Sequence, residues 1–418
     1  MANLTRNIGL SLGADLCWPA SYEALIRLLD LKIPLGDDVV DFAVERVTVE
    51  PFDLAYKPKY DLVLDRITHW FFTSREWVKK IALMDGVYVL NNPWGIQAYE
   101  KHTTYCAMMR LGMPIPTTWM IPPKEYQDEG DTKVTVQRYN RLFKLSDVGE
   151  AVGYPSFLKP YDGGGWVGVT RVTEEASLHR AYDKSGARVQ HLQAGVKDWD
   201  MFVRAIGVGP QVNLVRYNPD APLHDRYTTD TGFLTDDEAT TLRRICRTIN
   251  AFFAWDFNSC ESLRSGGVFH PIDFANACPD SQVTSLHFHF PWLVKALLRW
   301  TVFCAATKRK PRLVPDWDRF FAVADDASLS FEDKLAAYDA IANEMFDAER
   351  FEAFCAEHLA HLDEVAWTFF GTDAFKEIVR SKVAALYPKH EIDLFTDHFF
   401  DQVQRWRAYD AAQRGVAG

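Results

Sequence analysis

A single lysine followed by a glycine-rich segment is the part of this chain that points most directly to chemistry. Residues 154–172 read YPSFLKPYDGGGWVGVTRV and place Lys159 at the end of an apolar, strand-like run. The glycines that follow it are Gly163, Gly164, Gly165 and Gly168, with Trp166 among them, before a second strand-like run. Glycine permits the close backbone approach that a nest of N–H groups around a phosphate requires, and lysine supplies a positive charge. A β-hairpin with a flexible turn explains the same residues and is, for this stretch alone, the commoner explanation.

A second hairpin holds two carboxylates that could share a cation. The glycine pair 266–267 is a strong turn signal between two β-prone runs. A hairpin symmetric about the second glycine sets Glu261 opposite Asp273, and Leu263 opposite Pro271. Two facing carboxylates destabilise a sheet, and a divalent cation such as Mg²⁺, which takes oxygen ligands, removes that cost. The competing interpretation is a different register, with both acids solvated on an exposed face.

The composition excludes several classes of protein. With 418 residues the chain is too long for one ordinary core, so we expect two or three domains. Its 46 basic and 57 acidic residues give a net charge of −11, which argues against bulk binding of nucleic acid or of anionic membrane surfaces. The 7 cysteines are scattered and form no CxxC pair, which is typical of reduced thiols. No signal-peptide pattern and no run of about 20 apolar residues is present. We therefore expect a cytosolic, cytoplasmic protein.

The patterning along the chain predicts four consecutive domains. Residues 1–95 alternate strand-like and helix-like runs, which predicts an open α/β domain with ligands beyond the carboxyl ends of its strands. Residues 96–195 predict a smaller α+β lobe that contains the Gly-rich loop and a helix around Arg138–Leu145. Residues 196–310 predict a larger lobe with the carboxylate hairpin. Residues 311–418 predict a helical extension, either a cap on the rest of the protein or a homodimer interface.

One helix of the larger lobe has a well-marked start. Thr235 and Glu238 have the spacing of a capping box, in which each side chain bonds the backbone N–H of the other residue. Four apolar residues then recur on one helical face: Leu242, Ile245, Ile249 and Phe252. This spacing predicts an amphipathic helix beginning at Thr235.

Four landmarks, in this order, resemble the ATP-grasp superfamily over about residues 90–295. The segment EKHTTYCAMMRLGMPIP is similar to a helix with an ATP-contacting lysine, which implies that role for Lys101. The opening stretch is similar to the strand lysine and Gly-rich loop of the family, which implies that Lys159 binds phosphate and that the loop with Trp166 closes over it. The segment VQHLQAGVKDWDMFVRAI resembles the strand that holds adenine. The resemblance implies ATP-binding and metal-binding roles for the remaining matched residues: His191, Leu192 and Gln193 at the hinge, Arg204 on the following strand, and Glu261, Asp273 and Asn276 as Mg²⁺ ligands.

The chain departs from the family pattern in two places. Gln193 stands where an acidic residue commonly binds the ribose. The last two metal ligands are usually one residue apart, whereas DFAN has two residues between Asp273 and Asn276. A β-bulge at Phe274–Ala275 is therefore expected to aim Asn276 at the metal.

The resemblance implies a fold and a reaction. The fold combines α/β and α+β parts: an open α/β N-terminal domain, two α+β lobes that hold ATP between them, and the helical C-terminal extension. The reaction is that of an enzyme, an ATP-dependent ligase with Mg²⁺ or Mn²⁺, which activates a small-molecule carboxylate as an acyl phosphate for attack by an amine or thiol. Phosphoryl transfer needs positioning and neutralisation of negative charge more than covalent help. Arg226 or Arg216 is expected at the γ-phosphate and the carboxylate, because a guanidinium binds two oxygens at once. A surface salt bridge explains either arginine equally well.

Other residues are weaker candidates for the substrate side. They follow predicted strand ends, precede the capping box or follow the metal motif: Ser11, Gly13, Asp65, Arg66, His69, His224, Asp225, Asp280, Ser281, Ser285 and His287. The pairs His287/His289 and His358/His361 lack a third ligand, so a structural role is expected for them. Two other functions stay open, a small-molecule kinase of the same fold and a nucleotide-binding protein without turnover. A Rossmann dehydrogenase is disfavoured because the Gly run lacks G-x-G-x-x-G spacing.

Overall fold

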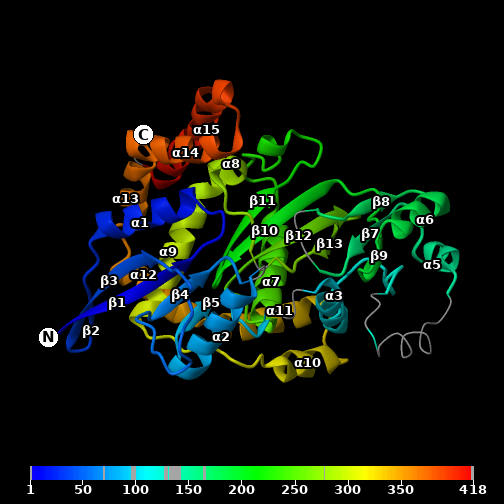
Figure 1. Cartoon of the computed structure of the whole chain (residues 1–418), viewed down its shortest axis with the longest axis horizontal. Helices are drawn as coiled ribbons and strands as arrows, with labels where there is room; N and C mark the ends of the chain where they lie inside the picture. Colours follow the sequence, from blue (N-terminus) through cyan, green and yellow to red (C-terminus); the bar gives the residue numbers. More distant parts are fainter. Residues whose placement is uncertain are drawn as a thin grey trace. The chain divides into compact units, whose positions relative to one another are not determined.

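The computed structural model describes residues 2–68, 71–95, 100–126, 130, 143–162, 166–276 and 278–415. The chain forms two compact units (Figure 1). The first unit comprises 1–97, 203–259 and 277–418, and the second comprises 98–202 and 260–276. The range 96–195 expected as one lobe falls almost entirely in the second unit, whereas the range 196–310 is divided between the two. The division into four domains stays a prediction.

The first unit is built on a mostly parallel sheet. Its strands are β1 (Ala2–Ser11), β2 (Ile33–Leu35), β3 (Asp38–Arg46), β4 (Leu62–Asp65) and β5 (Tyr88–Leu90), in the order β2-β3-β1-β4-β5. Only β2 is antiparallel to its neighbour, and it lies at the edge. From β1 the chain first moves to β3 on one side and later to β4 on the other. Ligands of open α/β sheets bind beyond the carboxyl ends of strands at such a reversal.

Helices pack against this sheet. They are α1 (Cys17–Leu29), α2 (Phe72–Asp85) and α9 (Phe290–Ala306). Helix α9 is apolar on nearly every side and packs against β1 and β4, which explains why almost all of its residues are buried. Helix α2 packs Trp77, Val78 and Ile81 against Val63 of β4 and Val89 of β5. The open α/β domain predicted for the N-terminal region is therefore present.

Helix α7 (Asp236–Phe252) begins where the capping box predicts. The Thr235 hydroxyl accepts a hydrogen bond from the Glu238 N–H at 3.3 Å, and the Glu238 carboxylate accepts one from the Thr235 N–H at 2.9 Å. All four apolar residues of the predicted face are buried. Both parts of this prediction are confirmed.

The second unit contains a four-stranded sheet with one apolar and one polar face. Its strands are β6 (Thr118–Ile121), β7 (Ser156–Pro160), β8 (Thr170–Val172) and β9 (Gln190–Ala194), in the order β6-β9-β7-β8. The apolar face packs on α5 (Leu145–Val152) and α6 (Glu175–Asp183) through Leu158, Leu192 and Val172. Helix α3 (Lys101–Arg110) precedes β6. The helix predicted around Arg138–Leu145 lies almost wholly outside the described residues.

A further sheet has the order β11-β10-β12-β13. Its strands are β10 (Met201–Val208), β11 (Gln211–Arg216), β12 (Phe257–Ser265) and β13 (Val268–Asp273). The boundary between the two units runs through β10 and β12, and β13 belongs wholly to the second unit. The predicted carboxylate hairpin is the β12–β13 pair.

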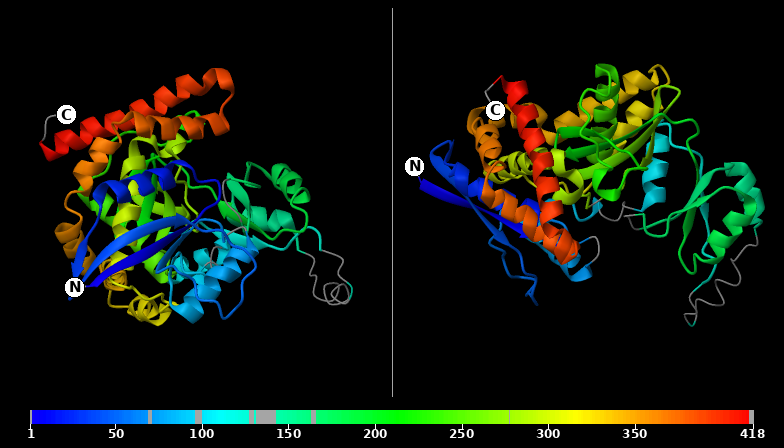
Figure 2. Two further views of the ribbon diagram at one scale, coloured as in Figure 1. Left: turned by 60° about the vertical axis from the view of Figure 1, so that its left-hand side comes forward. Right: turned by 90° about the horizontal axis from the view of Figure 1, so that it is seen from above.

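The C-terminal region is helical, as predicted. Its helices are α10 (Trp317–Asp325), α11 (Phe331–Phe346), α12 (Ala348–His358), α13 (Leu362–Phe369), α14 (Asp373–Leu386) and α15 (Ile392–Arg414). Helix α11 packs on α7, α12 and α13 pack on α9, and α14 packs on α1. Helices α14 and α15 lie side by side (Figure 2). The extension therefore caps helices of the first unit.

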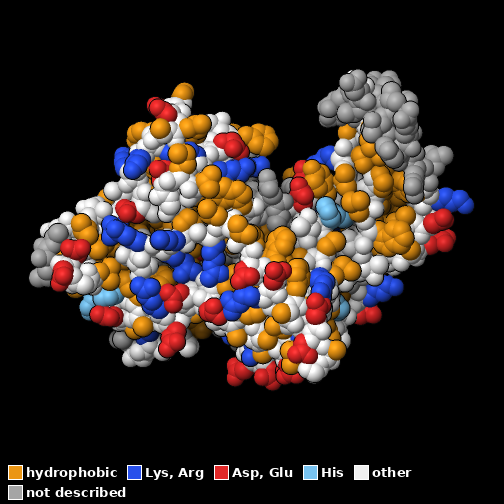
Figure 3. All heavy atoms as spheres, turned by 90° about the horizontal axis from the view of Figure 1, so that it is seen from below, with side chains coloured by type: hydrophobic (Ala, Val, Ile, Leu, Met, Phe, Trp, Pro, Cys, Tyr) orange, Lys and Arg blue, Asp and Glu red, His pale blue; other side chains and the backbone are white. Residues whose placement is uncertain are grey.

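One face of the molecule mixes both signs of charge. On the face drawn in Figure 3, acidic and basic side chains are interspersed among apolar ones, and neither sign forms a continuous field. Such a face does not have the basic stripe of a nucleic-acid site. Among the described residues, no helix combines the length and the apolar composition needed to cross a bilayer.

Candidate nucleotide site

Strand alternation places the polar side chains of the second unit on one face of its sheet. Along β9, Leu192 is fully buried in the apolar cluster, so His191 and Gln193 lie on the opposite face. Lys159 pairs directly with His191 in the ladder and shares that face. Any contact of Leu192 with a ligand on this face would have to come from its backbone. The strand that carries Lys159 and the hinge-like strand are therefore neighbours in one sheet, and their polar side chains share one face.

The carboxylate hairpin sets Glu261 opposite Asp273, as predicted, but the register of the strands between this pair and the turn differs from the predicted one. The turn is a two-residue Gly266-Gly267 loop with φ of +56° and +80°, values that favour glycine. This turn pairs Pro271 with Ser262, so the predicted pairing of Pro271 with Leu263 is wrong. The register then shifts between Glu261 and Ser262, leaving Ile272 as the extra residue of a β-bulge.

The bulge has a consequence for the site. Since Ile272 has no partner residue in the ladder, its carbonyl can bond elsewhere. It accepts hydrogen bonds from the Tyr105 hydroxyl at 2.9 Å and from the Lys159 ammonium at 3.3 Å. The bulge expected at Phe274–Ala275 lies instead at Ile272, because the strand pair already ends at Asp273. Asn276 follows in the loop beyond the strand and is half-buried.

Two lysines from separate elements converge on this hairpin. The Lys101 ammonium lies 2.9 and 2.8 Å from the two carboxylate oxygens of Asp273. The Lys159 ammonium donates to Gln193 Oε1 at 2.7 Å and to the Ile272 carbonyl. Both lysines are buried, although lysine is rarely buried unless it is paired. The N–H of Lys101 also bonds the Tyr161 carbonyl at 2.8 Å, so the start of α3 is held against the chain that follows β7.

The electrostatics of Lys159 reflect this crowding. The pKa of Lys159 is lowered to about 8, chiefly by burial; the Asp273 carboxylate opposes this fall, and the nearby Lys101 cation adds to it. A lysine with such a pKa retains its charge at neutral pH at a free-energy cost. An anion bound beside it would remove part of that cost.

His191 is the other perturbed group on this face. Burial, His102 and the two lysines lower the pKa of His191 to about 4, so the ring is neutral at neutral pH. Neither ring nitrogen has a hydrogen-bond partner among the described residues. A neutral imidazole has one donor and one acceptor nitrogen, and both are usually satisfied when buried. His102 and Tyr105 of α3 lie 5.8 and 5.9 Å from its ring centroid.

The Gly-rich loop is described only in part. Gly163, Gly164 and Gly165 lie outside the described residues. Trp166 has φ of +64° and is 53% exposed, and Gly168 has φ of +77°. A side chain at Gly168 would place its Cβ 2.8 Å from the Pro160 ring, so both the backbone conformation and the packing favour glycine there.

Similarity to known proteins is confined to the level of structure. No protein-family model matches the sequence, and no curated protein does. The structure resembles a RimK-domain ATP-grasp protein from Sphaerobacter thermophilus at 12% identity and a TM-score of 0.47, covering 70% of this chain and 97% of that chain. It resembles D-alanyl-alanine synthetase A from Vibrio cholerae at 13% identity and a TM-score of 0.49, covering 74% and 99%. It resembles D-alanine–D-alanine ligase from Bacillus anthracis, complexed with ATP, at 11% identity and a TM-score of 0.45, covering 82% and 99%.

At these identities and TM-scores the likeness carries no conclusion about residues or substrates. The chain's own elements occur in the order and pairing predicted for the fold: a helix with Lys101, a strand with Lys159, a hinge-like strand at 190–194, and a hairpin with two facing carboxylates. This order of elements is the one that the resemblance to the ATP-grasp superfamily predicts. The helical C-terminal extension is part of the same first unit as the α/β domain.

In the first unit, predicted substrate-side residues gather at the reversal of the sheet. The Ser11 hydroxyl donates to Asp65 at 2.9 Å, which joins the carboxyl ends of β1 and β4. Burial raises the pKa of Asp65, and hydrogen bonds from Thr68 and Ser11 oppose that rise. His69 lies outside the described residues. With Thr68 and Ser11 as donors, Asp65 holds the turn after β4 in place.

Arg66, the residue after Asp65, is held by several polar contacts. It is buried, pairs with Asp15 at 3.3 Å, and donates to the Ser281 hydroxyl and the Pro279 carbonyl at 2.8 Å each. Its second terminal nitrogen, Nη1, has no hydrogen-bond partner among the described residues. Burial alone would raise the pKa of Asp15, but the charge of Arg66 and the hydrogen bonds around the carboxylate lower it. Sequence patterning missed Asp15, which lies in an irregular segment after β1 with no motif around it.

Three predicted arginines also lie in the first unit: Arg204, expected on the strand after the hinge, and Arg216 and Arg226, expected at the γ-phosphate. Arg204 lies over the rings of Tyr217 and Tyr227, 5.5 and 5.3 Å from their centroids. Arg216 forms an exposed ion pair with Asp230 at 3.0 Å. Arg226 donates to the Ala221 carbonyl at 3.2 Å. Arg216 and Arg226 lie on neighbouring segments, because the Thr228 N–H bonds the Arg216 carbonyl and the Asn218 N–H bonds the Arg226 carbonyl.

The histidines divide into two groups. His289 bonds the Thr228 carbonyl at 2.8 Å, and His358 packs on Phe354, which are structural roles as expected. His224, by contrast, lies beside Asp225 and beside His398 of α15. Sequence patterning could not pair His224 with His398, since they are far apart in the chain. Asp280 accepts from the N–H of Gln282 at 3.0 Å and closes a local turn.

Proposed function

We propose that this protein is an ATP- and Mg²⁺-dependent ligase that activates a carboxylate as an acyl phosphate for attack by an amine or a thiol. The observation that carries the proposal is the group of charges in the second unit. Two buried lysines from different elements, Lys101 and Lys159, meet one face of a hairpin on which Asp273 stands opposite Glu261. Such a set of fixed charges suits phosphoryl transfer, where neutralising the phosphate oxygens is the main task.

A polyphosphate is the anion that this group of charges favours. Lys159 carries its charge at a cost, and Asp273, the carboxylate that raises its pKa, is already paired with Lys101. Phosphate oxygens beside Lys159 would stabilise its charged form and restore its pKa towards the usual value. The glycines at 163–165 and Gly168 would add backbone N–H donors, as inferred from their sequence.

The carboxylates fit a hard divalent cation. Glu261 is buried, and Asp273 faces it across the hairpin, so the two offer oxygen ligands of the kind that Mg²⁺ takes. The Lys101 ammonium, held on both Asp273 oxygens, places a positive charge at this position, which supports the proposal of a cation there. We propose Glu261, Asp273 and Asn276 as the residues that hold Mg²⁺ or Mn²⁺, which would neutralise phosphate charge when bound.

The hinge residues fit a base that offers both donors and acceptors. His191 has two buried ring nitrogens without partners, one of them a donor and one an acceptor in the neutral ring. Gln193 is committed on both sides, since its Oε1 accepts from Lys159 and its Nε2 donates to Thr118 at 2.9 Å. We therefore assign adenine recognition to His191 rather than to Gln193, and phosphate binding to Lys159 with Gln193 as its positioning partner.

The acceptor substrate is assigned to the first unit. Arg66 is the strongest candidate there, because a buried guanidinium with a nitrogen to spare is suited to a carboxylate. Ser281 accepts a hydrogen bond from Arg66, and Asp65 accepts one from the Ile67 N–H in the turn that holds Arg66. We propose Arg226 or Arg216 for the acyl phosphate. His224, Asp280 and His287 also lie in the first unit, and we assign no specific substrate contact to them.

The decisive experiment traps the activated carboxylate. A panel of carboxylic acids is incubated with MgATP and hydroxylamine, and hydroxamate and ADP are measured together. A ligase forms both in equal amounts, and Lys159→Met abolishes both, whereas Lys184→Met, at an exposed lysine of the same unit, changes neither. ADP release with an alcohol substrate and no hydroxamate would indicate a kinase instead. Tight ATP binding with no ADP release from any acid and nucleophile would indicate a protein without turnover.

A further inference from the structure

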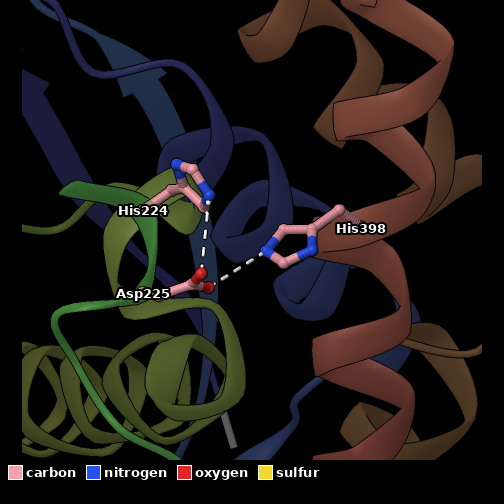
Figure 4. Close-up of side chains that lie close together, drawn as sticks. All are labelled: His224, Asp225 and His398. Atoms are coloured by element: carbon pink, nitrogen blue, oxygen red, sulfur yellow. Dashed lines mark ion pairs between the residues drawn. The ribbon is translucent and has the colours of Figure 1, made fainter. Parts of the chain in front are cut away.

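Two histidines and an aspartate from distant parts of the first unit converge at one point (Figure 4). His224 and Asp225 lie on the short turn η2 (Leu223–Asp225), in the connection from β11 to α7, and His398 lies on α15. His224 Nε2 is 3.5 Å from Asp225 Oδ2, and His398 Nε2 is 3.4 Å from Asp225 Oδ1. One ligand atom from each residue lies within 4.8 Å of the others.

Hydrogen bonding does not account for this arrangement. His398 Nε2 is buried and has no hydrogen-bond partner among the described residues, although it faces Asp225. The same is true of three further polar atoms on the elements packed here: His287 Nε2 on η3 (His287–His289), and Thr396 Oγ1 and Gln402 Oε1 on α15. Buried polar atoms are normally paired with protein or with a bound species. The unpaired His398 Nε2, which faces a carboxylate that also contacts a second imidazole, points to a bound group.

We propose that His224, Asp225 and His398 form a site for a divalent transition-metal ion of the zinc class. Zinc binds imidazole nitrogen and carboxylate oxygen at about 2.0–2.2 Å in tetrahedral geometry, which separates neighbouring ligand atoms by about 3.3–3.5 Å. His224 Nε2 has this distance to Asp225 Oδ2, at 3.5 Å, and His398 Nε2 has it to Asp225 Oδ1, at 3.4 Å. With one oxygen of Asp225 as the ligand, all three ligand atoms lie within 4.8 Å of one another, so a small adjustment of the side chains would complete the tetrahedral spacing. Two imidazoles are poor ligands for Mg²⁺, so this site differs in metal class from the carboxylate hairpin.

Aromatic rings flank both imidazoles of the site. Phe395 lies 5.2 Å from the His224 ring, and Phe399 lies 5.1 Å from the His398 ring, both measured between centroids. These rings exclude water from one side of the imidazoles and restrict their orientation. His287 Nδ1 accepts from the Phe288 N–H at 2.8 Å, which leaves its Nε2 as a buried donor.

The site would tie the C-terminal extension to the connection between β11 and α7. Helix α15 supplies one ligand, and η2, which directly precedes Arg226, supplies two. Metal binding would therefore restrict the segment that holds Arg226. Any effect on turnover through Arg226 rests on the proposed function, whereas metal binding itself does not.

The test measures metal binding by the full-length chain without nucleotide. Zn²⁺ is titrated into protein purified with a chelator, in competition with a chromophoric chelator. The parent protein of this experiment carries Asp273→Asn, so that the carboxylate hairpin does not contribute, and every variant is made in that parent. The parent is expected to bind one Zn²⁺ per chain, and His398→Ala to weaken binding at least about 100-fold, since even the loss of a hydrogen bond behind a ligand weakens binding about 10–100-fold. His390→Ala, at an exposed histidine of the same region, is expected to bind as the parent does.

A second measurement separates a metal site from a merely structural cluster. The melting temperature of the parent is expected to rise with Zn²⁺ and to fall with chelator, because a ligand that binds only the folded state stabilises it. His398→Gln and Asp225→Asn are expected to melt at one temperature in both conditions. The proposal is overturned if the parent binds Zn²⁺ no more tightly than His398→Ala or His398→Gln, or if Zn²⁺ leaves its melting temperature unchanged. Both outcomes are independent of ATP, so they leave the proposed ligase activity untouched.

Discussion

The affinity for ATP should fall as the pH rises through about 8, because Lys159 must be charged to bind phosphate. Burial and Lys101 lower the pKa of Lys159 to about 8 in the free protein. At that pKa the charged fraction is about 0.9 at pH 7 and about 0.1 at pH 9. Phosphate oxygens beside the ammonium raise its pKa in the complex, so binding at high pH must first restore a proton.

The size of the effect follows from proton linkage. If the pKa in the complex exceeds about 10, the affinity falls about tenfold between pH 7 and pH 9, which corresponds to about 1.4 kcal/mol. Binding at pH 9 then takes up close to one proton per ATP, and binding at pH 7 takes up about 0.1. The direction is set by the sign of the charge, since a carboxylate required in its ionised form would give the opposite trend.

Isothermal titration calorimetry measures both quantities. ATP with Mg²⁺ is titrated at pH 7, 8 and 9 in pairs of buffers that differ in ionisation enthalpy, without an acceptor substrate. Lys159→Gln is expected to bind more weakly at pH 7 and to lose the proton uptake at pH 9, whereas Lys184→Gln should match the parent protein. An affinity that is constant from pH 7 to 9, with no difference between buffers, would refute the placement of Lys159 at the phosphates.

Three further predictions concern other parts of the chain. Asp273→Asn should abolish Mg²⁺-dependent ADP release, and normal activity at limiting Mg²⁺ would show that Asp273 is not a ligand. ATP should change the fluorescence of Trp166, which is half-exposed beside the Gly-rich loop, and the change should be absent in Trp166→Phe. Asp339→Ala should lower the free energy of unfolding by about 3 kcal/mol, because it leaves the mostly buried Arg247 without its carboxylate partner. Arg247 now donates to both Asp339 oxygens, at 2.7 and 2.8 Å. Chemical denaturation measures this loss, and an unchanged midpoint would show that the pair contributes little.

Features set by neighbours in the sequence could be predicted. The Thr235 capping box and the apolar face of α7 follow from helical spacing, and both are present. Helix α2 was not predicted as an element. Its apolar stripe is interrupted by Lys80, which is buried through an ion pair with Asp85 at 2.7 Å, and a buried charge looks like a solvent-facing residue in the sequence.

The carboxylate hairpin could be predicted only in part. Its glycine pair predicts a turn, and counting from the second glycine correctly sets Glu261 opposite Asp273. That agreement depends on two offsets that cancel, a two-residue turn and the bulge at Ile272. A bulge has no reliable signature in the sequence, because it is stabilised by what its free carbonyl meets, here Lys159 and Tyr105.

By itself the sequence determined where the chemically active residues stand on their own elements. It placed Lys159 at the end of an apolar strand before glycines, Lys101 on a helix, and two carboxylates on a hairpin, because local hydrogen bonding and side-chain alternation depend on residues close in the chain. Only the tertiary structure decided which of them meet. Lys101 reaches Asp273, Arg66 reaches Ser281, and His224 reaches His398, through packing between segments distant in the sequence. Spacing within one segment carries no record of that packing, and the charges and pKa values of the site arise from it.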